Sequence, residues 1–214
     1  MNTLSVKECL SFGWKTFKAR PWFFVGTFAF YAAIQIVLSY LQKILPGFVS
    51  FLLSMISSTL LYIGLITIYL KAYADPKSPQ FSDFWRPELF WRYLAASLLL
   101  AVIVIVGLIL LIVPGVFLAL AFAFTGYLVV DKGMNPVAAL KESARITKGS
   151  RLKLLLLGVI LVILTILGAL PLFLGLLVIG PVSMLAGIHA YRVLEKAAGT
   201  EAPVVEATPE TPAA

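Results

Sequence analysis

A cluster of basic residues in a chain of otherwise apolar segments is the first candidate for chemistry. The stretch LKESARITKGSRLK, residues 140–153, contains five of the seventeen Lys and Arg residues. On a helix, Lys141, Arg145 and Lys148 share one face because they are spaced at i, i+4 and i+7. Each such base near an anionic membrane surface contributes about 1 kcal/mol. The cluster is interpreted first as an anchor that fixes the membrane topology; the alternative is that Lys141, Arg145, Lys148 and Arg151 are head-group contacts for anionic lipid.

Patterns typical of catalysis or metal binding are not found in the sequence. It contains no HExxH, GxSxG, GxxxxGK[ST] or GxGxxG motif. Cys9 and His189 are the lone members of their residue types, which predicts an inert thiol and an interfacial imidazole rather than metal ligands. The interiors of the spans predicted below hold no Asp, Glu, Lys or Arg, so proton relays are not expected. We expect no enzymatic activity and no cofactor.

The elements that position the basic cluster belong to a membrane protein. Apolar residues make up 61% of the 214-residue chain, charged residues make up 13%, and the mean hydropathy is +1.00. These values lie far outside the range of soluble domains. The net charge of +7 comes from short clusters beside apolar segments, which is typical of a membrane surface and does not predict a nucleic-acid partner.

The apolar segments predict six spanning helices. Two apolar blocks, 91–130 and 152–193, are about twice as long as a single span and must each contain two spans and a turn. Prolines and glycines mark the reversals. The predicted turn residues are Pro46, Gly47, Pro114, Gly115 and Pro171. The predicted spans are 21–41, 47–70, 91–112, 115–131, 152–170 and 173–193.

A short amphipathic helix is expected before each pair of spans, at 5–19, 78–86 and 136–148. Ser5, Ser78 and Asn135 are the candidate N-caps. The predicted fold is thus an all-α integral membrane protein, with six transmembrane helices arranged as three Pro-turn hairpins, each preceded by an interfacial helix on the cytosolic side. This domain covers residues 1–196. Residues 197–214 are rich in Pro, Ala, Thr and Glu and are expected to form a disordered cytosolic tail.

The distribution of basic residues predicts the orientation in the membrane. All Lys and Arg residues except Lys43 fall in the terminal segments or the longer connections on one side of the predicted spans. The positive-inside rule then places both termini in the cytosol.

The C-terminal half resembles a loose group of bacterial multi-pass proteins related to the membrane domain of some glycerophosphoryl diester phosphodiesterases. The resemblance rests on IVPGVFLALAFAFTGYLVVDKG at 112–133, ALKESARITKGSRLKLLLLG at 139–158 and GPVSMLAGIHAYRVL at 180–194. The matching positions are Ala139, Leu140, Ser143, Gly149, Pro181 and Tyr191. The resemblance implies a six-span protein of the bacterial inner membrane. It implies no active-site residues, because catalysis in the phosphodiesterases belongs to a separate soluble domain.

Two functional hypotheses follow from these patterns. The first is a non-enzymatic membrane protein that interacts with lipids, anionic ones in particular, or with a protein partner, in envelope maintenance. The partner would be a second copy of the chain or another membrane protein. The alternative is a transporter or substrate-binding component for a small uncharged solute, which would use polar span residues such as Gln35, Ser58 and Thr59. A membrane-embedded lipid enzyme would need a cluster of acids or histidines, and the sequence shows none.

Overall fold

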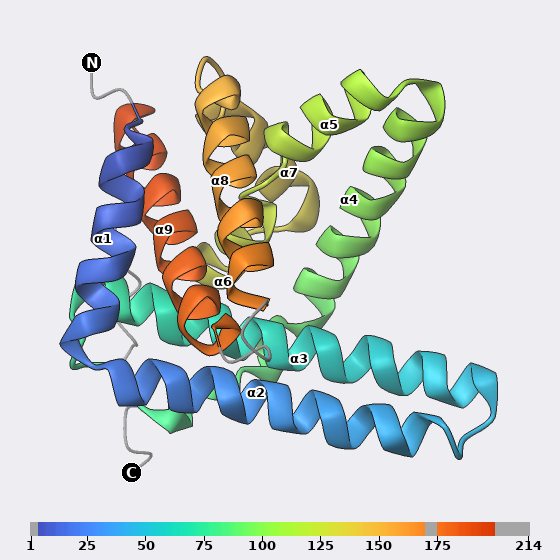
Figure 1. The fold of residues 1–214 in the computed structure, drawn as a ribbon. Coiled ribbons are helices and arrows are strands. Elements are labelled where there is room, and N and C mark those ends of the chain that lie inside the picture. The colour runs from blue at the N-terminus through green and yellow to red at the C-terminus, as the bar shows by residue number, and fades with distance from the viewer. Residues whose placement is uncertain (1–3, 170–174, 200–214) are drawn as a thin grey trace, which may run out of the picture.

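Helices form every regular element in residues 4–169 and 175–199, the parts of the chain that the computed structural model describes (Figure 1). The α-helices are α1 (Val6–Ala19), α2 (Pro21–Gln42), α3 (Gly47–Ala74), α4 (Phe90–Leu110), α5 (Ile112–Ala121), α6 (Thr125–Lys132), α7 (Pro136–Ile146), α8 (Arg151–Ala169) and α9 (Leu176–Ala197). Two 3-10 helices, η1 (Phe81–Phe84) and η2 (Pro87–Leu89), precede α4. Pro171 and residues 200–214 of the predicted tail lie outside the described residues.

Six helical segments are long and apolar enough to cross a membrane, which confirms the prediction of an all-α membrane fold. They are α2, α3, the run from η1 through α4, the run of α5 and α6, α8 and α9. Large apolar side chains on these helices point away from the protein, as at Val37, Ile109 and Ile166. Such extended apolar surfaces suit contact with lipid rather than with water.

Two of the three predicted N-caps are confirmed. The Ser5 hydroxyl accepts a hydrogen bond from the Glu8 N–H at 3.4 Å and begins α1. The Asn135 side chain accepts from the Val137 N–H at 3.3 Å, and α7 begins at the following proline. Ser78 does not begin a helix. Its hydroxyl instead donates toward backbone carbonyls of Lys71 and Asp75 at the end of α3.

The α-helix predicted at 78–86 is therefore wrong, and two 3-10 turns take its place. Asp83 fixes this segment: one carboxylate oxygen lies 2.5 Å from the Lys71 ammonium of α3, and the other accepts the Gln80 N–H at 3.0 Å. Prolines 79 and 87 bound the segment and leave too few residues for a stable α-helix.

The reversal between α4 and α5 differs in position from the prediction. The chain turns at Leu111, whose backbone is extended, and Pro114 and Gly115 lie in the first turn of α5. Proline is tolerated there because the first-turn N–H groups have no partner inside the helix. A Cβ on Gly115 would come within 2.8 Å of the Leu108 Cα, so this glycine permits close packing of α5 on α4. Pro46 and Gly47, the other predicted turn pair, lie at the start of α3. Pro46 is the N-cap and Gly47 is the first helical residue.

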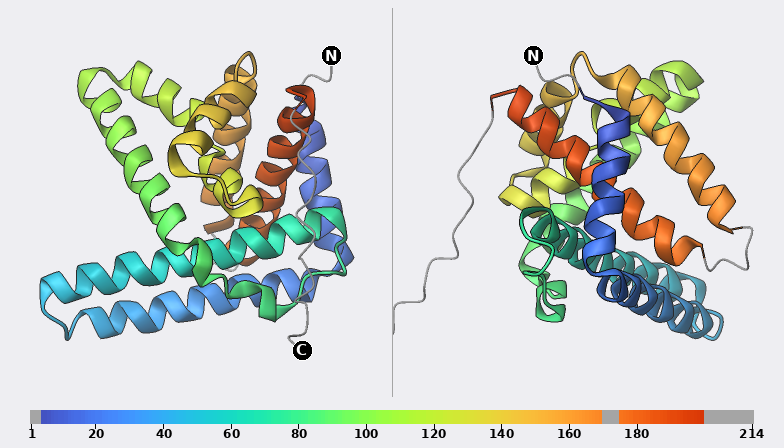
Figure 2. Two further views of the ribbon diagram at one scale, coloured as in Figure 1. Left: turned by 180° about the vertical axis from the view of Figure 1, so that it is seen from behind. Right: turned by 60° about the vertical axis from the view of Figure 1, so that its left-hand side comes forward.

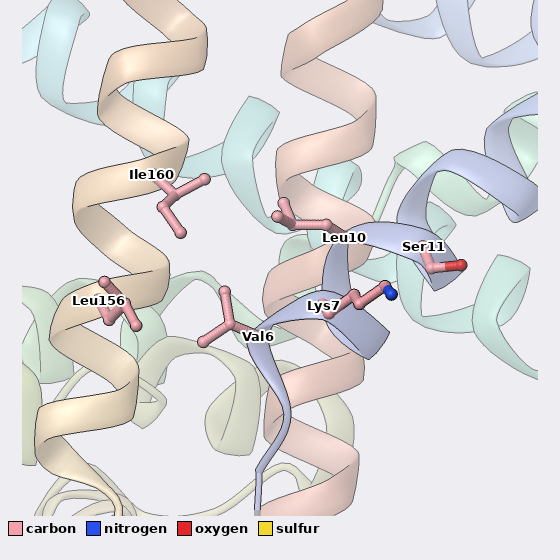
Figure 3. Close-up of a pocket in the computed structure, with 6 residues that line it drawn as sticks. All are labelled: Val6, Lys7, Leu10, Ser11, Leu156 and Ile160. Atoms are coloured by element: carbon pink, nitrogen blue, oxygen red, sulfur yellow. The ribbon is translucent and has the colours of Figure 1, made fainter.

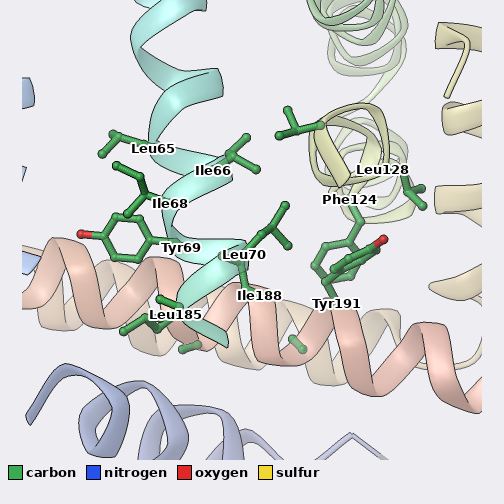
Figure 4. Packing of buried hydrophobic residues seen from close by; sticks show 14 of the residues in the cluster. Leu65, Ile66, Ile68, Tyr69, Leu70, Phe124, Leu128, Leu185, Ile188 and Tyr191 are labelled. Carbon is green, nitrogen blue, oxygen red and sulfur yellow. The ribbon is translucent and has the colours of Figure 1, made fainter. Parts of the chain in front are cut away.

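The main core lies where the second half of α3, α6 and α9 meet (Figure 4). Figure 4 shows Ile66 and Leu70 of α3 close to Ile188 of α9, with Phe124 and Tyr191 beside them. Phe124 and Tyr191 also make a ring contact, with centroids 5.8 Å apart. These side chains are almost fully buried, whereas α2, α4 and α8 bury few residues.

Helix α1 packs directly along α9, and Gly13 makes this contact possible. A Cβ at Gly13 would lie 2.7 Å from the Val182 carbonyl oxygen and 3.4 Å from the Ala186 Cβ. In the right panel of Figure 2, α1 crosses in front of the middle of α9. The side chain of Cys9 is buried at the same contact, and burial raises the pKa of its thiol to about 11.

Candidate functional site

An apolar groove lies between α1 and α8, beside the basic N-terminal segment. It has a volume of about 570 Å³ and is lined by Val6, Lys7, Leu10, Ser11, Leu156 and Ile160. Figure 3 shows the side chains of Val6 and Leu10 pointing from α1 toward Leu156 and Ile160 on α8. Four apolar side chains thus form its floor and walls, and the two polar ones come from a single helix.

One basic residue lines this groove, and a second precedes its lining residues on α8. Lys7 is exposed and belongs to the lining itself. Lys153 is also exposed and precedes Leu156 and Ile160 by three and seven residues, so it shares their face of α8. An apolar slot with lysines along its rim presents the two surfaces that an acyl chain and a phosphate require.

The four bases predicted as head-group contacts do not form one free cluster. Lys141 and Lys148 are exposed. Arg145 pairs with Glu142, with two N–O distances of 2.8 Å, and donates to the Ala198 carbonyl oxygen at 3.0 Å. The Arg151 guanidinium lies over the Phe117 ring, 4.4 Å from its centroid. Arg145 and Arg151 therefore link α7 and α8 to neighbouring parts of the protein, in addition to any contact with lipid.

A network of paired charges joins α6 to α9. Arg192 donates to Asp131 at 2.7 Å and to Glu195 at 3.0 Å. Lys132 lies 2.6 Å from Glu195, and the Tyr191 hydroxyl donates to Asp131 at 2.9 Å. The side chains of the four charged residues are only 7% to 28% exposed. Two acids and two bases balance one another, which keeps the cost of burying charge low.

The sequence patterns did not predict this network. One part of the network is visible in the sequence: Arg192 and Glu195 are an i, i+3 pair near the end of the apolar helix α9. The position of Asp131 beside them is decided by the packing of α6 against α9 and could not be read from spacing.

Helix α7 closes a break in the fourth span, another feature that the spacing alone did not predict. Between α5 and α6, residues 122–124 leave the regular helix. The buried Ser143 hydroxyl accepts the Phe124 N–H at 3.1 Å and donates to the Ala121 carbonyl at 3.0 Å. Thr147 donates to the same carbonyl at 3.1 Å. The hydroxyl groups of α7 therefore satisfy backbone groups that the break exposes.

His189 of α9 is partly buried where α9 faces α1. Its ring stacks on Phe12 of α1, with centroids 4.5 Å apart, and Nδ1 is buried without a hydrogen-bond partner among the described residues. A second space of about 290 Å³ lies beside it, lined by Glu8, Ser11, Phe12, Lys15 and His189. Within the described ranges, His, Cys, Asp and Glu do not gather in groups of three that would hold a metal ion.

The comparison with known proteins places this arrangement in a family. Residues 88–211 match the family described as a domain of unknown function, DUF7847. The chain belongs to the DUF7847 family. The match starts within η2 and includes α4 to α9, so it covers the charged network, α7 and the α8 wall of the groove, while α1 lies outside it.

Similar proteins occur in mycobacteria. The chain is 28% identical over 135 residues to the uncharacterised protein Rv2560 of Mycobacterium tuberculosis and to the uncharacterised protein Mb2590 of Mycobacterium bovis. These matches cover 63% of the chain and 41% of each relative, so the relatives are much longer. No solved structure matches the chain significantly. The relation to the phosphodiesterase membrane domain finds no support in these matches and stays a prediction.

Proposed function

We propose that this DUF7847 protein is a non-enzymatic, multi-pass protein of the bacterial inner membrane that binds an anionic phospholipid at its cytosolic surface. The groove between α1 and α8 is the observation that carries the proposal. One acyl chain would lie against Val6, Leu10, Leu156 and Ile160, and the phosphate would lie between Lys7 and Lys153. A role in envelope maintenance, through lipid or through a partner held with it, is the broader function proposed.

The arrangement of the helices supports this orientation. The groove lies at the end of α8 where the basic residues gather, and the positive-inside rule assigns such an end to the cytosol. Helix α1 packs against α9 and begins beside the same end of α8, so Lys7 near its start would face the head groups. Lys141 and Lys148 of α7 would add to the attraction for anionic lipid without forming a pocket.

The proposed membrane topology has both termini in the cytosol and three hairpins, formed by α2 with α3, α4 with α5 and α8 with α9. Each of these pairs is packed together. The preceding elements, α1, the η1–η2 segment and α7, would lie at the cytosolic interface. Cysteine accessibility scanning in whole cells tests this: a cysteine at Lys43 should react with an impermeant maleimide from outside, and one at Lys148 should not.

Native mass spectrometry of the protein purified from membranes tests lipid binding. Phosphatidylglycerol and cardiolipin should be retained, and the Lys7→Gln/Lys153→Gln variant should lose them. Removing two basic contacts of about 1 kcal/mol each predicts roughly a thirtyfold weaker retention. Ile160→Trp, which fills the groove without changing charge, should have a similar effect.

Two matched variants serve as controls. Lys43 lies at the C-terminal end of α2, away from the residues of the groove. The Lys43→Gln variant should retain lipid as the native chain does. The Lys141→Gln/Lys148→Gln variant should keep the lipid in the groove and lose only the non-specific attraction of surface charge for anionic lipid. If this α7 variant loses bound lipid while the Lys7 and Lys153 variant keeps it, the groove is not the binding site.

A further inference from the structure

A separate cavity, distinct from the space beside His189, lies between the α2–α3 pair and α4. It has a volume of about 550 Å³ and is lined by Tyr31, Met55, Ser58, Thr59, Tyr62, Tyr93, Leu94, Ser97 and Leu98. In Figure 1 this is the region where α4 diverges from α3. The volume is within the range of about 300 to 1,000 Å³ that is typical of small-molecule sites.

Hydroxyl groups dominate the polar lining of this cavity. Six of its nine lining residues carry a hydroxyl, and none of the nine is charged. Tyr31 and Tyr62 lie near the middle of α2 and α3, whereas tyrosines of membrane proteins are enriched at the ends of the spans. Polar groups at that depth are costly unless they make hydrogen bonds, so their concentration around one space indicates a binding site.

The contacts of these tyrosines leave them able to bind a ligand. The Tyr31 hydroxyl accepts a hydrogen bond from the Gln35 amide at 3.2 Å, and its own proton is then available to an acceptor in the cavity. The Tyr62 and Tyr93 rings lie side by side, with centroids 6.2 Å apart. Tyr93 is held against Gly126 of α6, where a Cβ would come within 3.2 Å of the phenol oxygen.

The chemistry of the lining defines the ligand. Ser58 and Ser97 donate to backbone carbonyls of their own helices, so the phenol groups would be the main donors to a ligand. Hydroxyl and ester oxygens can accept from these phenols, whereas a charged head group would be buried without a counter-charge. Met55, Leu94 and Leu98 supply apolar surface for an alkyl chain. Tyr62 and Leu98 are 40% and 52% exposed on the outer surface of spanning helices, which gives access from the bilayer rather than from water.

We propose that the cavity between α2, α3 and α4 binds an uncharged lipid whose polar group carries hydroxyl and ester oxygens, as in a diacylglycerol. The proposal does not rest on the anionic site at α1 and α8, because the two sites share no residue. A protein with both sites would hold a charged and an uncharged lipid at the same time.

Binding of dioctanoylglycerol to the full chain in detergent micelles tests the proposal. The Tyr31→Phe/Tyr62→Phe variant keeps both rings and removes two hydroxyls, and its Kd should rise roughly tenfold, as expected for two hydrogen bonds of modest net strength. Thr59→Val, which replaces a lining hydroxyl with a methyl group, should weaken binding to a smaller degree. Tyr40→Phe changes an exposed tyrosine of α2 outside the cavity and should leave the Kd unchanged.

Two further ligands test whether the cavity recognises an uncharged polar group together with acyl chains. Dioctanoyl phosphatidic acid adds charge to the same chains and should bind the cavity much more weakly; binding that depends on Lys7 instead reports the other site. Glycerol has no chains and should not compete. The proposal is overturned if dioctanoylglycerol does not bind, if the Phe variant binds it as well as the native protein, or if glycerol competes with it.

Discussion

Two halves of the molecule differ in how they use polar side chains. The packed half, formed by α1, α6, α7, α9 and the second half of α3, contains the charged network of Asp131 and Arg192 and the buried hydroxyl contacts of Ser143, beside buried atoms of Tyr69, Ser183 and His189 that have no partner among the described residues. In the open half, formed by α2, the first half of α3, α4 and α5, hydroxyls face a cavity and large apolar side chains face outward. The difference indicates that the packed half fixes the geometry of the protein and the open half provides surface for lipid.

The largest loss of stability is expected when the charged network of the packed half is broken. Glu195→Gln removes one carboxylate partner of Lys132 and one of Arg192. Because it leaves the buried network with an excess of positive charge, it should reduce the free energy of unfolding by about 3 kcal/mol. Titration with SDS in mixed micelles measures this quantity.

The exposed ion pair between Arg86 and Glu88 gives the control for this experiment. Glu88→Gln should change the free energy of unfolding little, because exposed pairs contribute at most about 1 kcal/mol. Equal effects of Glu195→Gln and Glu88→Gln would contradict the distinction between the two halves.

The next largest effect is expected at the break between α5 and α6. Ser143→Ala leaves the Phe124 N–H without its hydroxyl partner in a buried position, which should cost about 2 kcal/mol. Ser39→Ala is the matched change in the open half, where the hydroxyl only donates back to the Ile36 carbonyl of its own helix. The SDS midpoint should fall for the first variant and stay nearly constant for the second.

A steric test compares the same substitution in both halves. Gly13→Val should push α1 away from α9 and destabilise the fold by about 1 to 3 kcal/mol. Gly26→Val on α2 has no atom within 4 Å of the new Cβ among the neighbours described and should cost less. Loosening of α1 should also make Cys9 react with maleimide, and an unreactive thiol in a folded Gly13→Val protein would refute the role of this contact.

The smallest effect concerns pH. The pKa of Cys9 is about 11 in the folded protein against an ordinary value of 9.0, so the folded state favours the protonated thiol. Its contribution to stability is full below about pH 9 and is lost as the pH rises through 11. The difference in SDS midpoint between native protein and Cys9→Ala should therefore be constant from pH 7 to 8 and shrink above pH 9.

Much of the architecture follows from local physics that the sequence displays. Long apolar segments predict spanning helices because an unpaired backbone cannot enter lipid, and Ser5 and Asn135 predict helix starts because their side chains cap free N–H groups. The segment at 78–86 was predicted wrongly because Ser78, a typical N-cap, bonds to the end of α3 instead. At Pro114 the sequence indicated a reversal, but proline fits the first turn of a helix as well as it fits a turn.

The sequence by itself determined the six long apolar segments and the concentration of basic residues near one set of their ends. Only the tertiary structure decided which polar groups meet. Asp131 and Arg192 are far apart in the chain, and the lysine of α1 and the apolar face of α8 form a groove only when both helices pack beside α9. Helix propensity and hydrophobicity act over a few residues, whereas the partners of a buried side chain are set by the packing of whole helices.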